Sequence, residues 1–357
     1  MLMTALTSCN PDVELCYGEH PHRAHIVFDF EKSKYLENPP SRLMMFVFRA
    51  KNRLQINGDW MMQSSAFVPA NEVNPLYCSE NNLYAPTGDW IASALSADYL
   101  TLDGDPKLVN ASSLDQAWVV YSHMSYTDKN LSSGRFRYWH DRNGYSSYLS
   151  SLDEHPLLLG NASFNVSEWA QSSDVIHVPL SFSPISQTVR VNIPISADEG
   201  IVVDSVTVEV SGVCDNMKIG NRQVNVDTTY KVLFPTEIKA GYPTMAQGLF
   251  YAPGIVASQS PRLITGPGIL STMVFIHYFD ENGLKRPRTL EASINLFQLL
   301  SDTPSILENN LGESYQSKPE ITLDIPVLMH LTRTKIVSVG DAGLDQWIDQ
   351  TRIDMDF

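Results

Sequence analysis

Residues 189–195 read VRVNIPI and residues 206–210 read VTVEV, and in both stretches branched apolar residues alternate with other side chains. A period of two places the apolar side chains on one face of an extended chain, which is the signature of half-buried β-strands. The same alternation occurs near the start of the chain, where residues 26–30 read IVFDF. These stretches predict a fold that is built from strands.

Turn signals and further strand-like runs are spread along the whole chain. Asp280-Glu281-Asn282-Gly283 follows one run and ends in Asn-Gly, the strongest short hairpin signal. Nineteen Gly and 21 Pro residues suit many short strands joined by many turns. The other β-rich runs are residues 43–48, 117–121, 175–182, 273–279, 290–296 and 321–328.

Helical signal is confined to two segments. Residues 89–102 place Ile91, Leu95 and Tyr99 at helical spacing after Asp89, a suitable N-cap. Residues 298–311 are expected to hold a second short helix. We therefore expect an all-β fold of sandwich domains with few short helices.

A chain of 357 residues is long enough for two domains. Pro184 and small polar residues interrupt the strand pattern within residues 181–187, immediately before VRVNIPI. We expect an N-terminal β-sandwich domain at residues 10–183 and a C-terminal β-sandwich domain at residues 184–357. Residues 1–9 have a separate role in this interpretation.

The first nine residues end in Leu6-Thr7-Ser8-Cys9, which has the lipobox pattern of bacterial lipoproteins. We interpret residues 1–9 as the tail of an export signal and Cys9 as the lipid acceptor. A full signal has a basic region and an apolar stretch of about 7–15 residues, whereas no Lys or Arg precedes Cys9. An ordinary N-terminus with a chance cysteine is the alternative. Further along, no apolar run approaches the ~20 residues of a membrane span, so we expect attachment through lipid alone.

Composition and motifs argue against several classes of function. The net charge of −15 disfavours nucleic-acid binding, which needs clustered Lys and Arg. The sequence has no GxSxG, HExxH, GxxxxGK[ST] or GxGxxG motif, so we expect neither an enzyme nor a bound cofactor. A carboxylate pair for glycoside hydrolysis stays open, because 40 acidic residues are present.

Cysteine and histidine spacing gives no metal site. The four cysteines show no CxxC pair, so we expect buried free thiols and no zinc. His20, His22 and His25 lie close together, and two of them share a face of an extended strand. Arg23 stands among them and disfavours a cation, so we interpret this segment as the entry to the first strand.

Aromatic residues crowd positions 118–148, among Ser, Asn, Arg and Gly residues that are typical of loops. Exposed aromatic rings stack on the apolar faces of sugars, whereas aromatic residues in β-rich chains more often pack in the core. The candidates for glycan contact are Tyr126, Tyr138, Trp139 and Tyr145.

Four features together resemble the fimbrillin-like proteins of the Bacteroidetes, the group of fimbrial subunits and fimbrial anchor or accessory lipoproteins. They are the lipobox followed by residues 16–22 (CYGEHPH) and a strand ending FDF, the strand at 189–195, residues 206–213 (VTVEVSGV), and the closing LDQW at 344–347. The resemblance implies two β-sandwich domains of transthyretin-like, Greek-key topology. It also implies export as a lipoprotein to the outer membrane and the cell surface.

The same resemblance implies partners and processing. Partners would be other fimbrial subunits or surface ligands of a host or of bacteria, contacted by β-strand addition and by loops. Polymerising members of this group lose an N-terminal strand to a trypsin-like protease, which opens a groove for a neighbour's strand. Candidate processing residues are Arg42, Arg49 and Arg53, none of which stands in a clear signal.

Two functions follow as hypotheses. The first is a non-enzymatic surface lipoprotein that acts in fimbria assembly, anchoring or cell adhesion. The second is a surface glycan-binding lipoprotein associated with polysaccharide uptake. An open sheet edge or an exchangeable terminal strand favours the first, and exposed coplanar aromatic rings favour the second.

Overall fold

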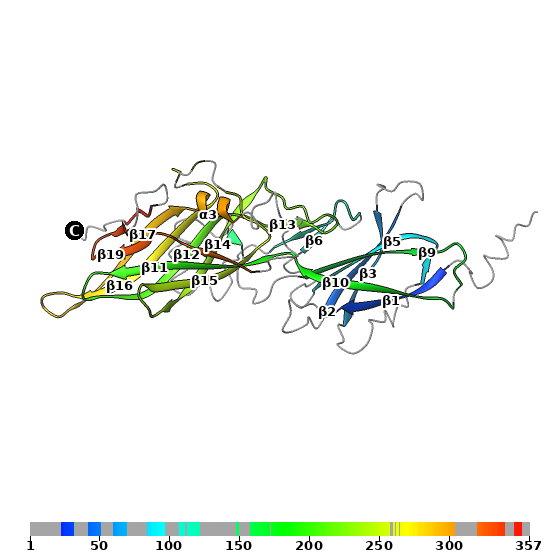
Figure 1. Ribbon diagram of the computed structural model, residues 1–357, viewed down its shortest axis with the longest axis horizontal. Helices are drawn as coiled ribbons and strands as arrows, with labels where there is room; N and C mark the ends of the chain where they lie inside the picture. Colours follow the sequence, from blue (N-terminus) through cyan, green and yellow to red (C-terminus); the bar gives the residue numbers. More distant parts are fainter. Residues whose placement is uncertain are drawn as a thin grey trace, which may run out of the picture. The chain divides into compact units, whose positions relative to one another are not determined.

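A computed structural model of the chain shows an almost entirely β protein, which confirms the predicted fold class (Figure 1). No helix among the residues described is long and apolar enough to cross a membrane. The structure describes residues 23–31, 42–50, 60–69, 84–96, 107–110, 113–121, 148–149, 158–171, 173–257, 260, 262–263, 265–303, 320–339 and 346–351.

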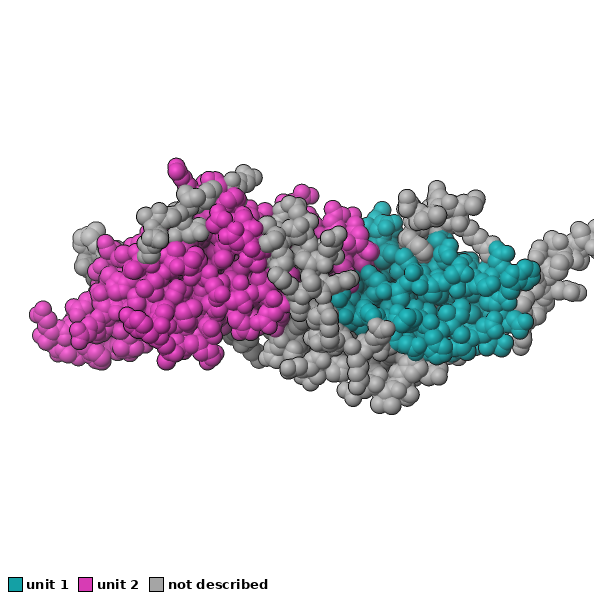
Figure 2. Space-filling model, in the orientation of Figure 1, with its two compact units in different colours: residues 1–102, 108–118, 157–183 teal, residues 103–107, 119–156, 184–357 magenta. Residues whose placement is uncertain are grey.

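The chain forms two compact units (Figure 2). Unit 1 comprises residues 1–102, 108–118 and 157–183, and unit 2 comprises residues 103–107, 119–156 and 184–357. β8 (Tyr148–Leu149) lies upstream of the expected boundary, yet it pairs in parallel with residues 231–232 of a strand far along the chain. The limits of independently folding domains therefore stay a prediction.

Unit 1 is built on a seven-stranded sheet in the order β3-β2-β5-β9-β10-β1-β4. β1 runs parallel to β10, whereas the pairs β2–β3, β2–β5, β5–β9 and β1–β4 are antiparallel. The strands are β1 (Arg23–Glu31), β2 (Arg42–Ala50), β3 (Trp60–Pro69), β4 (Tyr84–Pro86), β5 (Gly88–Ser96), β9 (Leu158–Val166) and β10 (Val175–Pro184).

The expected helix at residues 89–102 is wrong as far as the structure describes it, because residues 88–96 form β5. β5 lies between β2 and β9, and both neighbours supply backbone hydrogen bonds along its length. Trp90, Ala92 and Ala94 are buried in the core of unit 1 at every second position. Because two of these three residues are alanines, the alternation typical of a strand is weak in the sequence. Asp89 does not cap a helix; its carboxylate accepts a hydrogen bond from Asn165 Nδ2 at 2.7 Å.

Unit 2 is built on an eleven-stranded sheet whose main path runs β20-β19-β11-β15-β14-β12-β16-β17-β21. β18 adds to β11 and β8 to β14. The two ends of the path meet, since the Ile336 amide donates to Asp349 Oδ1 at 3.1 Å and the Trp347 amide to Ser338 Oγ at 2.6 Å. The sheet is therefore curled into a barrel-like sandwich.

The bounds of the unit 2 elements agree with most sequence expectations. The second helix, expected at residues 298–311, is present as α3 (Phe297–Asp302); it ends at Asp302, and residues 304–311 lie outside the described residues. The strands are β11 (Gln187–Ala197), β12 (Ile201–Cys214), β14 (Thr229–Lys239), β15 (Thr244–Ala252), β16 (Ile269–Phe279), β17 (Lys285–Asn295), β18 (Glu320–Asp324), β19 (Leu328–Leu331), β20 (Ile336–Val339) and β21 (Ile348–Asp349). A separate three-stranded sheet has the order β13-β7-β6 and consists of β13 (Asn216–Lys218), β7 (Trp118–Val120) and β6 (Lys107–Val109).

The VRVNIPI stretch forms the centre of β11, and its alternation is the alternation of burial. Val189, Val191, Ile193 and Ile195 are all buried in the core of unit 2, while the residues between them are half-buried. Val206, Val208 and Val210 of β12 enter the same core. Apolar burial on this scale is the main source of stability for such a sheet.

Candidate functional site

The feature of unit 1 that suits a partner strand is the position of β1 near one border of the sheet. On one side β1 pairs with β10 over seven residues, from His25↔Val175 to Glu31↔Ser181. On its other side, within the part of the chain that the structure describes, β4 pairs with residues 23–25 alone. Residues 26–31 of β1 therefore have an outer edge that no described strand covers.

The direction of the backbone groups tells which residues face this edge. The His25 amide donates to the Asp174 carbonyl at 2.8 Å, so His25 points its backbone toward β10. Successive residues of a strand point their amide and carbonyl groups to opposite sides. Phe28 and Phe30 consequently present theirs to the outer edge, which is the geometry that strand addition uses.

The side chains of β1 tie this strand to the core. Ala24, Ile26 and Phe28 are fully buried in the core of unit 1. The ring of Phe28 meets the ring of Phe164 edge to face, with 6.3 Å between the centroids. Asp29 adds a contact to β10 through His177 Nδ1, at 2.9 Å. β1 is thus a fixed element of unit 1, and along residues 26–31 no strand among the described residues pairs with its outer edge.

In unit 2 the outer edge of β17 carries groups that oppose pairing with another strand. The Glu291 amide and carbonyl both point away from β16, to Thr351 Oγ1 and to the Gln350 amide. By alternation, Lys285, Pro287 and Thr289 face the same outer edge, along which the described residues supply no partner strand. Pro287 has no amide hydrogen, and charged side chains and proline on an edge discourage pairing.

A rigid hairpin joins β16 and β17. The Asp280 carboxylate accepts hydrogen bonds from the Asn282 and Leu284 amides, each at 2.9 Å, and from Arg286 Nε at 2.8 Å. These bonds hold the pKa of Asp280 below its usual value, and the bond from the Leu284 amide has the largest effect. Gly283 has a φ of 74°, so the Asn-Gly signal marks a loop with a left-handed glycine, as the sequence predicted.

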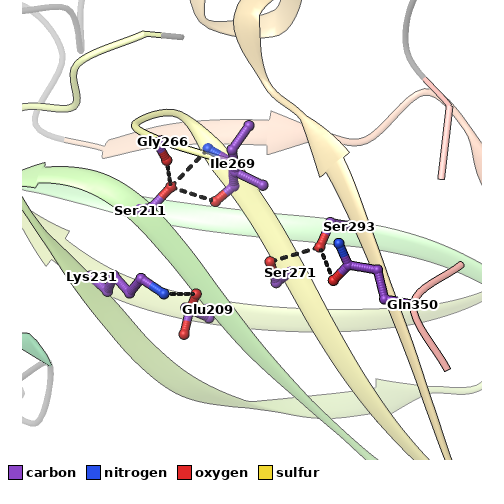
Figure 3. Close-up of polar contacts among 8 residues, drawn as sticks. All are labelled: Glu209, Ser211, Lys231, Gly266, Ile269, Ser271, Ser293 and Gln350. Atoms are coloured by element: carbon purple, nitrogen blue, oxygen red, sulfur yellow. Dashed lines mark hydrogen bonds and ion pairs between the residues drawn. The ribbon is translucent and has the colours of Figure 1, made fainter. Parts of the chain in front are cut away.

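Polar side chains of neighbouring strands in unit 2 form two separate sets of contacts, one between β12 and β14 and one between β16, β17 and Gln350 (Figure 3). Lys231 Nζ donates to Glu209 Oε1 at 2.9 Å. The hydroxyls of Ser271 and Ser293 are 2.9 Å apart, and Ser293 donates to Gln350 Oε1 at 3.1 Å (Figure 3). Bonds between side chains on neighbouring strands fix the register of a sheet, so both sets stabilise the fold of unit 2.

A serine, a histidine and a carboxylate also meet on unit 2. Ser196 and His330 are register partners of β11 and β19, with Ser196 Oγ 2.9 Å from His330 Nδ1. His330 Nε2 lies 3.0 Å from Asp198 Oδ1. Because the contact joins two side chains directly opposite in paired strands, it is a cross-strand pair of the usual stabilising kind.

Of the three candidate processing residues, Arg49 is the best described. It lies in β2, where Nη2 donates to the Thr87 carbonyl at 2.7 Å and the guanidinium is 5.5 Å from the centroid of the Trp90 ring. Arg42 is the first residue of β2, and Arg53 lies outside the described residues. Processing at any of them stays a prediction.

Most other sequence candidates lie outside the described residues. These are Cys9, His20, His22, Tyr126, Tyr138, Trp139 and Tyr145. His25 is in β1 and stacks on Tyr84, with 5.3 Å between the ring centroids. In the part of the chain that the structure describes, no three His, Cys, Asp or Glu side chains gather as metal ligands. Cys214 is buried and forms no disulfide, which agrees with the expectation for the described cysteine.

Sequence reasoning missed two exposed aromatic residues, Trp169 and Tyr242. Of the described aromatic side chains they are the most exposed, and each lies in a turn between two strands. A lone aromatic residue in a β-rich sequence is ordinarily interpreted as core. The signal that was available is the polar Ser-Glu-Trp context at residues 167–169.

No protein-family model and no curated protein sequence matches the chain. Among solved structures, the chain is similar to a putative adhesin from Bacteroides ovatus, with a TM-score of 0.45, 12% identity, and coverage of 82% of this chain and 87% of that one. It is similar to a putative adhesin from Bacteroides thetaiotaomicron, with a TM-score of 0.45, 10% identity, and coverage of 88% of this chain and 92% of that one. It is also similar to the fimbrial anchor protein Mfa2 from Porphyromonas gingivalis, with a TM-score of 0.42, 10% identity, and coverage of 92% of this chain and 98% of that one. The descriptions of these proteins agree with the resemblance drawn from the sequence.

Proposed function

We propose that this chain is a cell-surface protein of the fimbrillin-like type that acts in fimbria assembly, anchoring or cell adhesion. Its partner contributes a β-strand that adds to the outer edge of β1. The partner is another fimbrial subunit or a surface protein with an extended segment.

The observation that carries the proposal is the outer edge of β1 at residues 26–31, which no described strand covers, beside a buried core. The strand is held in place by Ile26 and Phe28 and by its ladder to β10, so its edge is preorganised. Preorganisation lowers the conformational entropy that β1 itself loses when a partner strand binds. The outer edge of β17 in unit 2, by contrast, carries Pro287 and charged side chains, which discourage strand addition there.

Attachment through Cys9 completes the proposal. A diacylated or triacylated Cys9 would hold the protein on the outer membrane, whereas one acyl chain gives only marginal binding. Growth with a labelled fatty acid tests this part, with Cys9→Ala as the control. Label on both proteins, or on neither, contradicts the lipid anchor and leaves the strand edge untouched.

Strand addition is tested with a pair of variants at Phe30. Phe30→Pro removes the outward amide hydrogen, while Phe30→Ala removes the same ring and keeps the amide. Tagged full-length chain is used to capture fimbrial subunits from an outer-membrane extract. We expect Phe30→Ala to capture them and Phe30→Pro to lose about tenfold or more. Equal capture by the two variants, or none by the unaltered protein, would contradict the proposal.

A further inference from the structure

The hairpin between β16 and β17 exposes the pair Asn282-Gly283 to solvent. Asparagine followed by glycine is prone to deamidation, because glycine has no side chain that obstructs attack on the asparagine amide. In this reaction the Gly283 nitrogen loses its proton and attacks Asn282 Cγ, ammonia leaves, and a succinimide ring forms. Water then opens the ring at either carbonyl and gives aspartate or isoaspartate. The loop therefore contains the residues for a spontaneous covalent modification.

The structure engages the attacking nitrogen in a hydrogen bond. The Gly283 amide donates to the Asp280 carbonyl at 2.9 Å. Ring closure requires that this nitrogen be deprotonated, whereas the hydrogen bond favours the protonated form. The nitrogen must also turn toward the side chain of Asn282, which requires rotation about the bond between Cα and the carbonyl carbon of that residue. The bond to Asp280 opposes both steps.

The Asp280 carboxylate holds the backbone on both sides of Asn282. Its Oδ1 accepts hydrogen bonds from the Asn282 amide and from the Leu284 amide, each at 2.9 Å. The Leu284 carbonyl accepts the Asp280 amide at 3.0 Å, which closes the base of the loop. Arg286 Nε donates to the other carboxylate oxygen at 2.8 Å and so orients the group. Rotation within the loop therefore breaks several of these bonds at once.

The paired strands continue directly from this loop. Their register pairs run without interruption from Phe279↔Lys285 to Ile269↔Asn295. Gly283 has a φ of 74°, which glycine adopts without strain, so the loop keeps its bonds at no backbone cost. Local opening costs least in loops with few fixed bonds and most in core strands. Deamidation is thereby limited to the fraction of molecules in which this loop has opened.

We infer that Asn282-Gly283 is a latent deamidation site, which the hydrogen bonds of Asp280 keep unreactive in the folded protein. Aspartate at position 282 would add a negative charge beside Asp280 and Glu281. Isoaspartate would lengthen the main chain by one methylene, so that the loop amides no longer match the Asp280 acceptors. The inference concerns the covalent chemistry of unit 2 and is independent of strand addition at β1.

The test is incubation at mildly alkaline pH, followed by peptide mapping with mass spectrometry that separates the asparagine, aspartate and isoaspartate forms. The full-length protein is compared with a synthetic peptide of residues 278–286, in which no strand pairing holds the loop. We expect the asparagine to disappear from the peptide about tenfold faster or more, because the protein must first open locally.

Three variants, each compared with a peptide of the same substitution, assign the protection to Asp280. Asp280→Ala removes the carboxylate acceptor of two loop amides, so the rate in the protein should rise about fivefold or more. Asp280→Asn keeps an oxygen acceptor and should retain most of the protection. Glu281→Ala is the matched control, because it removes an exposed carboxylate from the same loop and should leave the rate unchanged. Amide hydrogen exchange at Gly283 and Leu284 should rise in Asp280→Ala alone.

Equal rates in the unaltered protein and in the peptide would overturn the inference, and this comparison needs no variant. A rate in folded Asp280→Ala that stays at that of the unaltered protein would also overturn it. A rise of the same size in Glu281→Ala would do so as well, because the charge of the loop, and not the bonds of Asp280, would then control the reaction.

Discussion

Replacing Phe28 by alanine tests whether β1 is an integral part of unit 1. The Phe28 side chain is fully buried and contacts the ring of Phe164 edge to face. Truncation of a buried phenylalanine costs about 3–5 kcal/mol, from the lost transfer free energy and the cavity left behind. Whole domains are stable by only about 5–15 kcal/mol, so the loss is a large fraction of the stability of unit 1.

The assay is scanning calorimetry of the full chain. For a unit of this size, 1 kcal/mol shifts the melting temperature by roughly 3 °C or more. The transition of unit 1 should therefore fall by about 10 °C or more in Phe28→Ala. Unit 2 should melt as before, because Phe28 belongs to the core of unit 1.

His177→Ala is the matched control on the same pair of strands. The His177 ring contacts Asp29 at 2.9 Å, but it is largely exposed, and exposed ion pairs contribute at most about 1 kcal/mol. A shift in Phe28→Ala as small as the shift in His177→Ala would refute the reasoning, because β1 would then not be packed as described.

Three further predictions concern unit 2. Gly248→Val should cost about 1–3 kcal/mol in urea denaturation, because a Cβ at position 248 overlaps the buried Phe234 ring; an unchanged midpoint would contradict that packing. Ser211→Ala should cost about 1–3 kcal/mol, since Ser211 Oγ accepts the buried Ile269 amide at 3.0 Å; amide hydrogen exchange at Ile269 should rise, and unaltered exchange would count against it. NMR titration of Asp280 should give a pKa below 3.8, so its contribution to hairpin stability is present above the ordinary carboxyl pKa and is lost as the pH falls through the lower folded value; a pKa at or above 3.8 would show that the amide bonds do not hold in solution.

The sequence predicts the fold well where one face of a strand meets the core. Val189, Val191 and Ile193 alternate with less buried residues, so burial and hydrophobicity share one period. The hairpin signal at Asn282-Gly283 is local, and local turn chemistry does not depend on the rest of the chain.

The sequence did not predict secondary structure or strand pairing where contacts between distant segments determine them. Residues 88–96 form a central strand because β2 and β9 flank it, although Ile91 and Leu95 stand at helical spacing. Small residues such as Ala92 take the conformation that their neighbours impose. The parallel pairing of β1 with β10 joins segments about 150 residues apart, which no local pattern encodes.

The sequence predicted the type of candidate site, an edge for strand addition, but not its location in the fold. A resemblance in sequence implied strand addition, yet the free edge depends on which strands border β1. Exposure of Trp169 depends on the burial of Ala170 beside it, which only the packed structure reveals.

The most direct measurement of the central claim is residue-resolved amide hydrogen exchange of β1, in the isolated protein and in complex with a fimbrial subunit. In the isolated protein, Val27 and Asp29 should be protected by their bonds to β10, while Phe28 and Phe30 exchange faster. In the complex, Phe28 and Phe30 should become as protected as their neighbours, because an added strand then accepts their amides. Equal protection of all four amides in the isolated protein, or no change at Phe28 and Phe30 on binding, would contradict strand addition at this edge.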